Sequence, residues 1–392
     1  AKISRQMKID IAVDLKGFTH NERAGIFSYR CAPIQVNYLG YPGTMATEYI
    51  DYIIADPTLI PRKSQQFYSE KIVYLPHSYQ VNDAKRKISD KEFTKTELGL
   101  PERGFIFCCF NNNYKITPDT FDGWMRLLKA VDGSVLWLFE DNATAAMNLR
   151  KEAESRGVSK SRLVFAERMQ LPEHLARHKV ADLFLDTLPY NAHTTASDAL
   201  WAGLPVLTLM GESFAARVAG SLLNAIKLPE LITHTQEEYE AKAIELATKP
   251  ERLAEIKKKL AKNKLTTPLF NTILFTKHIE AAYKAMYERY ENHLPPDHIY
   301  VPEQTDTFAS RSAGEDTTVW PIFDSEKSPG KASDLSTQIV PVTSISSETV
   351  KSFDRIICKN NASHSSYKLF DSLTLSQPIQ VMDVGASAIA EV

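Results

Sequence analysis

The sequence predicts an α/β protein with two units, each a parallel β-sheet flanked by helices. Three features support this fold class: short apolar runs without polar alternation, helical segments between them, and a polar stretch that separates two groups of such runs. Runs of this kind are typical of strands buried on both faces, and alternating strands and helices are typical of a doubly wound parallel sheet. The 392 residues suffice for two or three domains.

The first unit is predicted at residues 1–77 and contains four strand-like runs. In chain order they are IDIAVDL (9–15), IQVNYLG (34–40), IDYIIAD (50–56) and KIVYLP (71–76). The segment ERAGIFSYR is predicted to be a helix between the first two strands. Because the opening AKISRQMKIDIAVDL is expected to begin inside a strand, this unit is predicted to be an incomplete lobe.

The second unit, residues 100–303, has the clearest pattern. Its strand-like runs are FIFCCF (105–110), SVLWLF (134–139), RLVFA (162–166), DLFLDT (182–187) and PVLTL (205–209). Helices are predicted between these runs, and the first has Thr117 at its cap and Pro118 as its first residue, which favours helix initiation. A C-terminal extension of three helices follows, and the folded core is expected to end near Tyr290.

The other segments are mostly polar. Residues 78–99 carry no apolar stripe, which predicts a surface connection between the two lobes. Residues 304–350 contain 16 Ser or Thr among 47, a composition that favours a flexible, disordered linker. Residues 351–392 close on IQVMDVGASAIAEV, which predicts a strand followed by a glycine turn.

Charge and cysteine content argue against several classes of partner. Lys plus Arg (46) nearly balances Asp plus Glu (48), so neither nucleic acid nor an anionic membrane is indicated as a partner. No apolar run approaches the ~18 residues needed to span a bilayer. The four cysteines lack a metal-ligand spacing and two are adjacent in an apolar run, which indicates a reducing compartment and predicts a cytoplasmic protein.

Ligands of open parallel sheets bind where strands end and helices begin, so the candidate site lies in these loops. After DLFLDT, His193 precedes a predicted helix start at Thr194 and Thr195, with Asp198 one turn later. Two hydroxyls, an imidazole and free backbone N–H groups suit a diphosphate. The alternative is that Thr194 is only a helix cap and Asp198 a favourable first-turn acid.

Two further segments add candidates. His174 and Arg177 are three residues apart and therefore share a helix face. His174 and His178 do not make a metal motif, because the glutamate of H-E-x-x-H and a third ligand are missing, and no metal site is predicted. Lys115 precedes a capped helix, where its ammonium would neutralise a leaving phosphate. The alternative for the lysine and the histidines is an ordinary surface position.

Motifs of the main competing enzyme classes are missing from the sequence. No G-x-G-x-x-G follows a strand, no G-x-x-x-x-G-K-[ST] exists for an NTPase, and no G-x-S-x-G marks a hydrolase. The candidates above instead fall on strand-end loops of one sheet, and this convergence predicts a single binding site.

Several long segments, which together span roughly residues 9–303, match the segments of a known family in the same order along the chain. They are RCAPIQVNYLGYPGTMATEYIDYIIAD, YSEKIVYLPHSY, FNNNYKITPDTF, SVLWLF, ADLFLDTLPYNAHTTASDALWAGLPVLTLMGESFAARVAGS and TTPLFNTILFT. With them the chain resembles the catalytic region of the O-GlcNAc transferase family, which also includes the plant fucosyltransferases called SPINDLY and related bacterial enzymes. The blocks LGYPGT and AHTTASDALWAG are specific to that family.

The resemblance implies a GT-B fold, with two Rossmann-like lobes, the donor nucleotide in the second lobe, an acceptor peptide across the cleft and no catalytic metal. It also implies that Lys115 contacts the donor diphosphate and that Asp198 holds the ribose. His174 and Arg177 are the pair that it implies contacts the base and nucleotide. The positions that match donor-binding residues of the family are Asn112, Lys115, His174, Arg177, His193, Thr194, Thr195 and Asp198. Lys115 and His174 are the predicted catalytic residues. The positions that match an acceptor-side loop are Gly40, Tyr41, Pro42, Gly43 and Thr44.

The chain departs from the family pattern at several places. Animal members carry glutamine where this chain has Asn112 and lysine where it has Leu171, which leaves the base and sugar of the donor open. The long insert between the lobes of animal enzymes is replaced by the short 78–99 connection, as in bacterial members. The family's first strands and its helical TPR repeats are expected to precede Ala1, so the chain is interpreted as a fragment that transfers little or no sugar alone.

The C-terminal IQVMDVGAS resembles the opening motif of FkbM-type methyltransferases, with Asp383 and Gly385 after an apolar strand. S-adenosylmethionine would be a cofactor only if a complete domain of this type existed. The alternative is an incidental strand and turn.

Together these inferences predict an inverting, metal-independent enzyme without a cofactor that transfers N-acetylglucosamine from UDP-GlcNAc to Ser or Thr of proteins. The expected partners are a nucleotide sugar and a protein or peptide acceptor. Two alternatives stay open: a different donor, GDP-fucose or UDP-glucose, and a catalytically degenerate scaffold that binds proteins.

Overall fold

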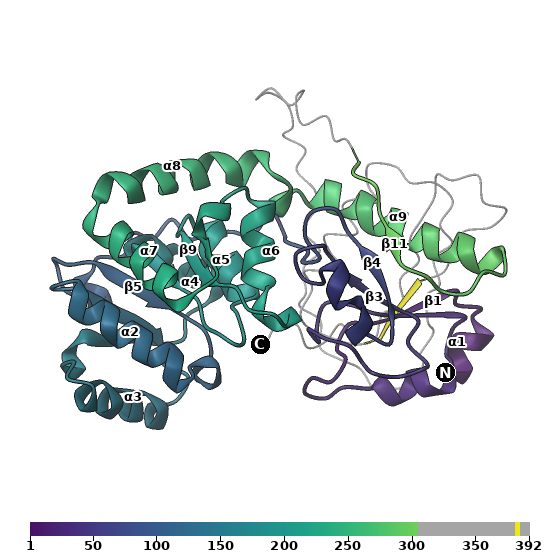
Figure 1. Cartoon of the computed structure of the whole chain (residues 1–392), viewed down its shortest axis with the longest axis horizontal. Helices are drawn as coiled ribbons and strands as arrows, with labels where there is room; N and C mark the ends of the chain where they lie inside the picture. The colour runs from purple at the N-terminus through teal and green to yellow at the C-terminus, as the bar shows by residue number, and fades with distance from the viewer. Residues whose placement is uncertain (305–380, 385–392) are drawn as a thin grey trace, which may run out of the picture.

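The computed structural model describes residues 1–304 and 381–384 of the chain. Within them, two six-stranded parallel sheets form two lobes that lie side by side (Figure 1). This arrangement confirms the predicted α/β class with two units. Apart from Gln304, the linker predicted at 304–350 lies outside the described residues, as does most of the predicted methyltransferase start at 351–392.

The first lobe is built on a sheet with the strand order β11-β4-β3-β2-β1-β12. Its strands are β1 Ile11–Asp14, β2 Ile34–Asn37, β3 Tyr52–Ala55, β4 Lys71–Tyr74, β11 Ile299–Tyr300 and β12 Val381–Val384. Nearly every residue of β1 to β4 is buried, which explains why these segments lack polar alternation. The predicted C-terminal strand is confirmed as β12, and it pairs in parallel with β1.

Two expectations for this lobe need correction. The residues before β1 form a short helix, α1 Lys2–Gln6, so the chain does not begin inside a strand. The side chain of Ser4 in this helix is buried and donates a hydrogen bond to the Cys31 carbonyl, so tertiary packing fixes the segment. The predicted helix at ERAGIFSYR is a 3-10 helix, η1 Ala24–Tyr29, and it ends at Arg30 in the left-handed conformation.

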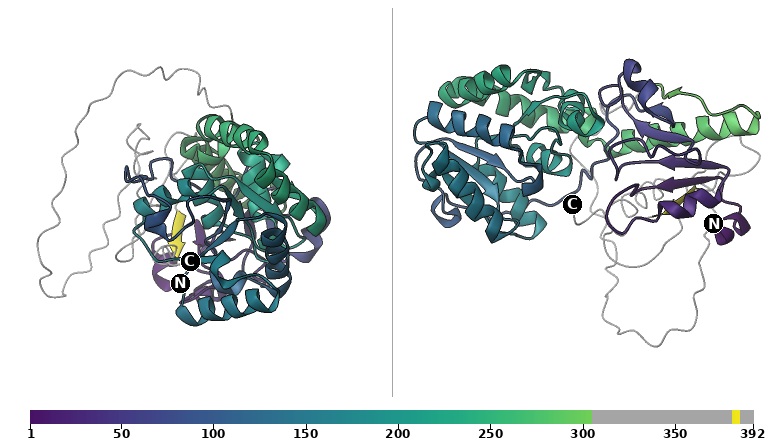
Figure 2. Two further views of the ribbon diagram at one scale, coloured as in Figure 1. Left: turned by 90° about the vertical axis from the view of Figure 1, so that its left-hand side faces the viewer. Right: turned by 60° about the horizontal axis from the view of Figure 1, so that its bottom comes forward.

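The second lobe has the strand order β10-β9-β8-β5-β6-β7. Its strands are β5 Ile106–Cys109, β6 Val135–Phe139, β7 Leu163–Ala166, β8 Leu183–Leu185, β9 Val206–Leu209 and β10 Ile232–Thr233. Helices cover both faces of this sheet (Figure 2). They are α2 Pro118–Ala130, α3 Ala143–Ser155, α4 Leu171–Arg177, α5 Thr194–Ala202, α6 Val218–Ala225, α7 Gln236–Thr248 and α8 Pro250–Thr266.

The last long helix crosses back to the first lobe. The helix α9 Thr272–Glu291 packs on β2, where Figure 1 shows it beside β11 and β4. β11 then pairs in parallel with β4, and Val301 is buried with its N–H bonded to the Tyr74 carbonyl at 3.0 Å. The folded core therefore does not end near Tyr290 as expected, because the residues after that helix complete an edge of the first sheet.

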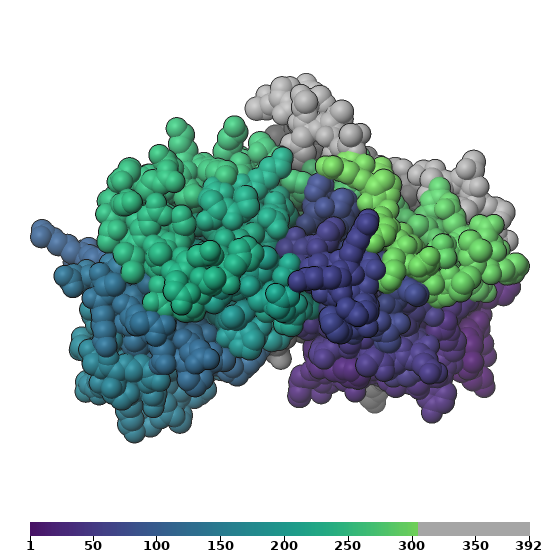
Figure 3. Space-filling model, in the orientation of Figure 1, coloured from purple at the N-terminus to yellow at the C-terminus, as the bar shows by residue number. Residues whose placement is uncertain are grey.

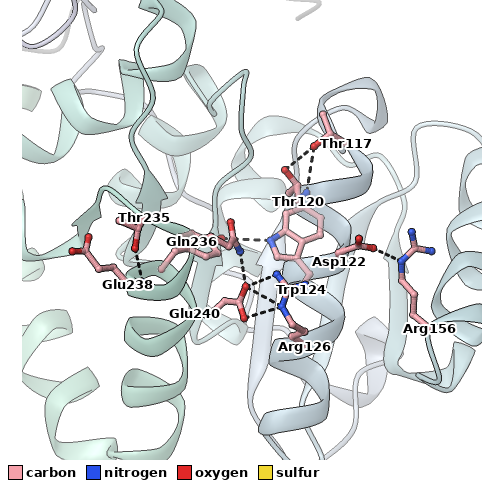
Figure 4. Close-up of polar contacts among 11 residues, drawn as sticks. Thr117, Thr120, Asp122, Trp124, Arg126, Arg156, Thr235, Gln236, Glu238 and Glu240 are labelled. Atoms are coloured by element: carbon pink, nitrogen blue, oxygen red, sulfur yellow. Dashed lines mark hydrogen bonds and ion pairs between the residues drawn. The ribbon is translucent and has the colours of Figure 1, made fainter.

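The helices α2 and α7 pack together (Figure 4), and a hydrogen bond from Tyr239 of α7 supports the end of β8. The predicted cap is confirmed, since the Thr117 hydroxyl accepts the Thr120 N–H at 3.3 Å. Further along α2, the guanidinium of Arg126 binds both carboxylate oxygens of Glu240 on α7. The indole of Trp124 donates to the Tyr239 hydroxyl, which in turn donates to the carbonyl of Asp186 directly after β8. The two helices thus fix the backbone from which a candidate site loop departs.

The lobes contact each other through α6, a helix that the sequence analysis did not assign. Arg217, Ser221 and Asn224 lie on one face of α6 and its start, and all three donate hydrogen bonds to the segment 56–58 after β3. Beside them, the rings of Tyr79 and Phe214 meet edge to face at 5.1 Å. In the space-filling view the lobes touch along their upper part, and the surface is indented between them below (Figure 3). No helix among the described residues is both long and apolar enough to cross a membrane.

Candidate functional site

The predicted site loops meet where the second sheet changes its direction of winding. The chain runs from β5 outward to β6 and β7, and then returns to place β8 on the other side of β5. The loops that follow β5 and β8 therefore diverge at this point, and such switch points are where open α/β sheets bind ligands. Asn111 after β5 donates to the Thr187 hydroxyl after β8 at 2.8 Å, so the two loops are joined.

Lys115 lies in this position, at the end of the 3-10 helix η4 Asn113–Lys115. It is not a solvated lysine, since only 7% of its surface is exposed. Its Nζ donates to the Asn191 carbonyl at 3.0 Å and lies 4.3 Å from the centre of the Tyr190 ring. Burial lowers the pKa of Lys115 to about 8, although the nearby carboxyl of Asp186 opposes this effect. Asn112 begins the same turn, and its carbonyl accepts the Lys115 N–H at 3.0 Å.

Asp186, at the end of β8, organises the loop that carries these partners. Its carboxylate accepts hydrogen bonds from the Thr208 hydroxyl at 2.6 Å and from the N–H groups of Thr187 and Ala192 at 2.8 and 2.6 Å. Burial raises its pKa to about 6 in spite of these bonds. The Asp186 carboxyl interacts electrostatically with the Lys115 ammonium, and the loop that it holds carries Asn191, whose carbonyl accepts from Lys115.

His193, Thr194 and Thr195 form the start of α5. The helix begins at Thr194 and His193 is in the cap position, so the alternative in which Thr194 caps the helix does not hold. The His193 side chain makes no capping hydrogen bond to this helix. The Thr195 hydroxyl donates to Asn111, and the His193 ring stacks on Tyr190 with 4.9 Å between ring centres. Exposed Thr194 and the first N–H groups of α5 leave a helix terminus suited to an anion.

Burial also keeps His193 neutral. It lowers the pKa of His193 to about 3, and the positive charge of Lys115 acts in the same direction. Both groups contact the Tyr190 ring, His193 by stacking and Lys115 through its ammonium. At neutral pH the single positive side-chain charge of this pair is therefore on Lys115, with His193 as a neutral hydrogen-bonding group.

His174 and Arg177 are brought together on α4, as their spacing predicts. Arg177 Nη2 lies 2.6 Å from His174 Nδ1, and Arg177 Nη1 donates to the Glu167 carbonyl at 2.6 Å. The guanidinium lies over the Phe110 ring at 4.6 Å, and Arg177 is fully buried. Burial lowers the pKa of His174 to about 2, helped by His178 and Arg177. The neutral ring accepts from Arg177 at Nδ1, so its proton is on Nε2.

The His174 and His178 pair has no third partner of the metal-binding type. No group of three or more His, Cys, Asp or Glu residues able to hold a metal occurs among the described residues. His178 Nδ1 instead bonds to the His174 carbonyl at 2.7 Å, and the two rings meet edge to face. These histidines pack with Phe110 after β5, so α4 is fixed against the same strand end as Lys115.

Asp198 is buried on α5 and forms an ion pair with Arg86 of the inter-lobe connection. Asp198 is the fifth residue of the helix and no acidic residue lies in its first turn, so the alternative of a favourable first-turn acid does not hold. Burial raises the pKa of Asp198, while Arg86 opposes the rise. The ribose role that the resemblance gives to Asp198 stays a prediction.

The loop at residues 40–44 lies on the first lobe and follows β2. A Cβ on Gly40 would meet the Leu15 carbonyl oxygen at 2.2 Å, so a larger residue does not fit against this backbone. Thr44 donates to the Glu70 carboxylate at 2.6 Å, which fixes the end of the loop. The hydroxyl of Tyr41 is near enough to Tyr190 to contribute to the raised pKa of Tyr190, for which burial is the main cause. Tyr41 therefore lies across from the Lys115 loops.

The sequence analysis missed several residues of this site: Arg86, Asn111, Asp186, Tyr190 and Asn191. The one available signal was the position of Asp186 at the end of an apolar strand, where an acid accepts N–H groups of the following loop. A hollow of about 300 Å³ lies elsewhere, at the amino-terminal ends of β1 and β2, and is lined by Arg5, Lys8 and Arg30 among others. It does not contact the residues described above.

Comparison with known proteins identifies the family of the chain. The profile of glycosyl transferase family 41 matches residues 1–94 and 91–279. The chain is 41% identical over 309 residues to the probable UDP-N-acetylglucosamine–peptide N-acetylglucosaminyltransferase SEC of Arabidopsis thaliana, covering 77% of the chain and 32% of that protein. It is 32% identical over 296 residues to the SPINDLY protein of Hordeum vulgare, covering 74% of the chain and 31% of that protein.

A solved structure has the same architecture. A mutant of the Thermobaculum terrenum O-GlcNAc transferase superposes with a TM-score of 0.67 at 31% identity, covering 74% of this chain and 55% of that one. The two parallel α/β lobes are those of a GT-B fold, as expected. The chain spans about a third of the length of these curated plant relatives. With the profile matching well over half of its residues, the chain belongs to glycosyltransferase family 41.

Proposed function

We propose that the chain is the donor-binding and catalytic region of an enzyme that transfers N-acetylglucosamine from UDP-GlcNAc to Ser or Thr hydroxyls of proteins. The SEC and SPINDLY relatives, both named as probable UDP-N-acetylglucosamine–peptide N-acetylglucosaminyltransferases, support this reaction. The observation that carries the proposal is the contact between two loops at the switch point of the second sheet. There the Lys115 ammonium donates a hydrogen bond to the carbonyl of Asn191, which is two residues before the cap residue of α5. A lysine and a helix terminus from separate loops suit one diphosphate.

The proposed chemistry is a direct displacement with inversion at the anomeric carbon, independent of a metal or cofactor. As the glycosidic bond breaks, negative charge grows on the departing diphosphate. Lys115 and the N–H groups at the start of α5 stabilise this charge because they are already in place before reaction. His174 and Arg177 contact the nucleotide, Asp198 binds the ribose, and the acceptor hydroxyl enters from the side of the Gly40–Thr44 loop. No residue is assigned as the base.

A different donor is the second candidate. Asn112 and Leu171 differ from the residues of animal members at positions near the donor, which supports testing GDP-fucose and UDP-glucose beside UDP-GlcNAc.

The burial of Lys115 argues against the alternative of a catalytically degenerate scaffold. Lys115 is buried and burial lowers its pKa, an arrangement with an energetic cost that protein binding does not require.

Calorimetric titration of residues 1–392 with UDP, GDP and their sugars tests the proposal. Binding of UDP and UDP-GlcNAc, with GDP binding at least tenfold weaker, is the expected result. Tighter binding of GDP would favour the fucose donor. Binding of none of these ligands would overturn the glycosyltransferase assignment for this chain and favour the scaffold.

The lowered pKa of Lys115 predicts a loss of activity at alkaline pH. An ammonium with a pKa of about 8 is charged below this pH and neutral above it. We expect kcat/KM of a full-length protein to fall about tenfold per pH unit above pH 8, because that parameter reports ionisations of the free enzyme. In Lys115→Arg, whose side chain stays charged, the remaining activity is expected to show no such fall. A flat wild-type profile up to pH 10 would contradict the prediction.

A further inference from the structure

The connection between the lobes is fixed to the helix that starts the predicted diphosphate site. Asn82 accepts a hydrogen bond from Ser197 on α5, and the indole of Trp201 donates to the Arg86 carbonyl at 3.1 Å. Between these two contacts, Arg86 Nη1 pairs with Asp198 Oδ1. The segment thus follows one face of α5 and brings a guanidinium to the carboxylate of that helix.

The Arg86–Asp198 pair is largely removed from solvent. The two side chains are 15% and 9% exposed, and the guanidinium carbon lies 5.9 Å from the centre of the Trp201 ring. Burial alone would favour a protonated, neutral Asp198, and the adjacent guanidinium favours the carboxylate. A carboxylate has two oxygens and about four acceptor positions, so an ion pair through one oxygen leaves room for hydroxyl donors.

The hydrogen bonding of Arg86 is incomplete. Its Nε and Nη2 are buried and have no partner among the described residues. Arg162, which anchors a loop of the same lobe, differs in this respect, since its Nη2 alone contacts the Leu128 and Val131 carbonyls and the Ser134 hydroxyl. A buried donor without a partner is costly, and more so on a charged group. An arginine with only an anchoring role would be expected to resemble Arg162.

We propose that Arg86 is a positioning residue of the donor site, which holds the Asp198 carboxylate for the ribose hydroxyls of a nucleoside diphosphate. The inference rests on the proposed function, because the ribose role of Asp198 is part of it. Arg86 acts on the ligand through Asp198, by fixing the orientation of the carboxylate and its charge. The inter-lobe connection is therefore a part of the nucleotide site and not only a link.

The test measures binding of UDP and of 2′,3′-dideoxy-UDP by calorimetry, with residues 1–392 as the protein. Arg86→Met is expected to weaken UDP binding roughly 10–100-fold, the range for losing a hydrogen bond to a charged group. It should leave the affinity for dideoxy-UDP unchanged, because that ligand has no ribose hydroxyls. Arg86→Lys keeps the charge without the planar fork and should fall between wild type and Arg86→Met.

A double-substitution cycle separates positioning from anchoring. Asp198→Asn should weaken UDP binding, and adding Arg86→Met to it should cause little further loss, because the arginine acts through the carboxylate. Arg252→Met, which removes the ion pairs of an arginine on α8 with Glu245 and Glu255, is the control and should leave UDP affinity unchanged.

Three results would overturn the inference: additive losses in the cycle, equal losses for UDP and dideoxy-UDP, or normal UDP binding by a folded Arg86→Met. If Arg86→Met does not fold, the affinity of Arg86→Lys for the two ligands decides the question in the same way. Failure of the unaltered chain to bind any nucleotide would instead remove the proposed function, and this inference with it.

Discussion

Replacing Lys115 by alanine in a full-length protein is expected to lower kcat roughly 10²–10³-fold, the usual cost of losing one preorganised electrostatic contact in a transition state. Donor affinity should change far less. The charge that Lys115 neutralises develops mainly while the glycosidic bond breaks, and an interaction gained only in the transition state appears in kcat. The measurement is steady-state kinetics with UDP-GlcNAc together with calorimetric binding of UDP.

Two variants control for packing and for general effects of removing a lysine. Lys115→Met keeps most of the apolar stem of the side chain and loses the ammonium, which lies over the Tyr190 ring, so it should lose activity like the alanine variant. Lys151→Met removes an exposed lysine of α3 and should behave as wild type. Near-normal turnover of a folded Lys115→Ala would mean that the diphosphate role of Lys115 is wrong.

The strands of both sheets were predictable because burial on two faces requires apolar residues at successive positions of the sequence. FIFCCF, for example, contains β5, in which all four residues are buried. Local chemistry was equally informative at the start of α2, where Thr117 and Pro118 predicted the boundary that the structure has. Two-sided burial and helix caps depend on neighbouring residues, so they can be inferred without the rest of the fold.

Elements that depend on distant partners were missed or misinterpreted. β11 has only two residues, and its pairing with β4 joins positions more than 200 residues apart. No hydrophobic periodicity in the sequence therefore indicates this strand. The first residues were expected in a strand but form α1, whose position is set by a contact between Ser4 and Cys31. Short apolar segments fit either structure, and the tertiary contacts decide between them.

The candidate site also contains residues that local sequence predicts and residues that only distant contacts reveal. Lys115 and the start of α5 were predicted because they follow strands, and the structure places them together. Their supports were not predicted, since the Lys115–Asn191 and Arg86–Asp198 contacts span 76 and 112 residues of sequence. Resemblance to a family supplied roles for single residues, whereas the hydrogen bonds that hold those residues came only from the structure.

Asp56→Ala is expected to lower the free energy of unfolding by about 3 kcal/mol at pH 7. Asp56 is fully buried between the lobes, and it accepts from the N–H groups of Thr58, Leu59 and Tyr79 and from the Ser221 hydroxyl. Four donors left without a partner cost about 1–3 kcal/mol each before relaxation. The alanine variant also lacks the buried negative charge of Asp56, and the free energy gained by its absence offsets part of this cost. Burial raises the pKa of Asp56 from 3.8 to about 6, and two pKa units correspond to about 3 kcal/mol.

The pH dependence of this loss gives the sharper test. A carboxyl whose pKa is raised on folding binds its proton more tightly in the folded state, so its contribution to stability grows as pH falls from about 6 toward 4. The alanine variant lacks that contribution, and its deficit should therefore be about 1 kcal/mol larger at pH 5 than at pH 7. Urea unfolding at both pH values measures the difference, and Ser221→Ala, which removes one donor of the four, should cost only about 1 kcal/mol. A deficit that shrinks at pH 5 would mean that Asp56 is held as a stabilised carboxylate, and that the bonds from α6 and the β3 loop outweigh its burial.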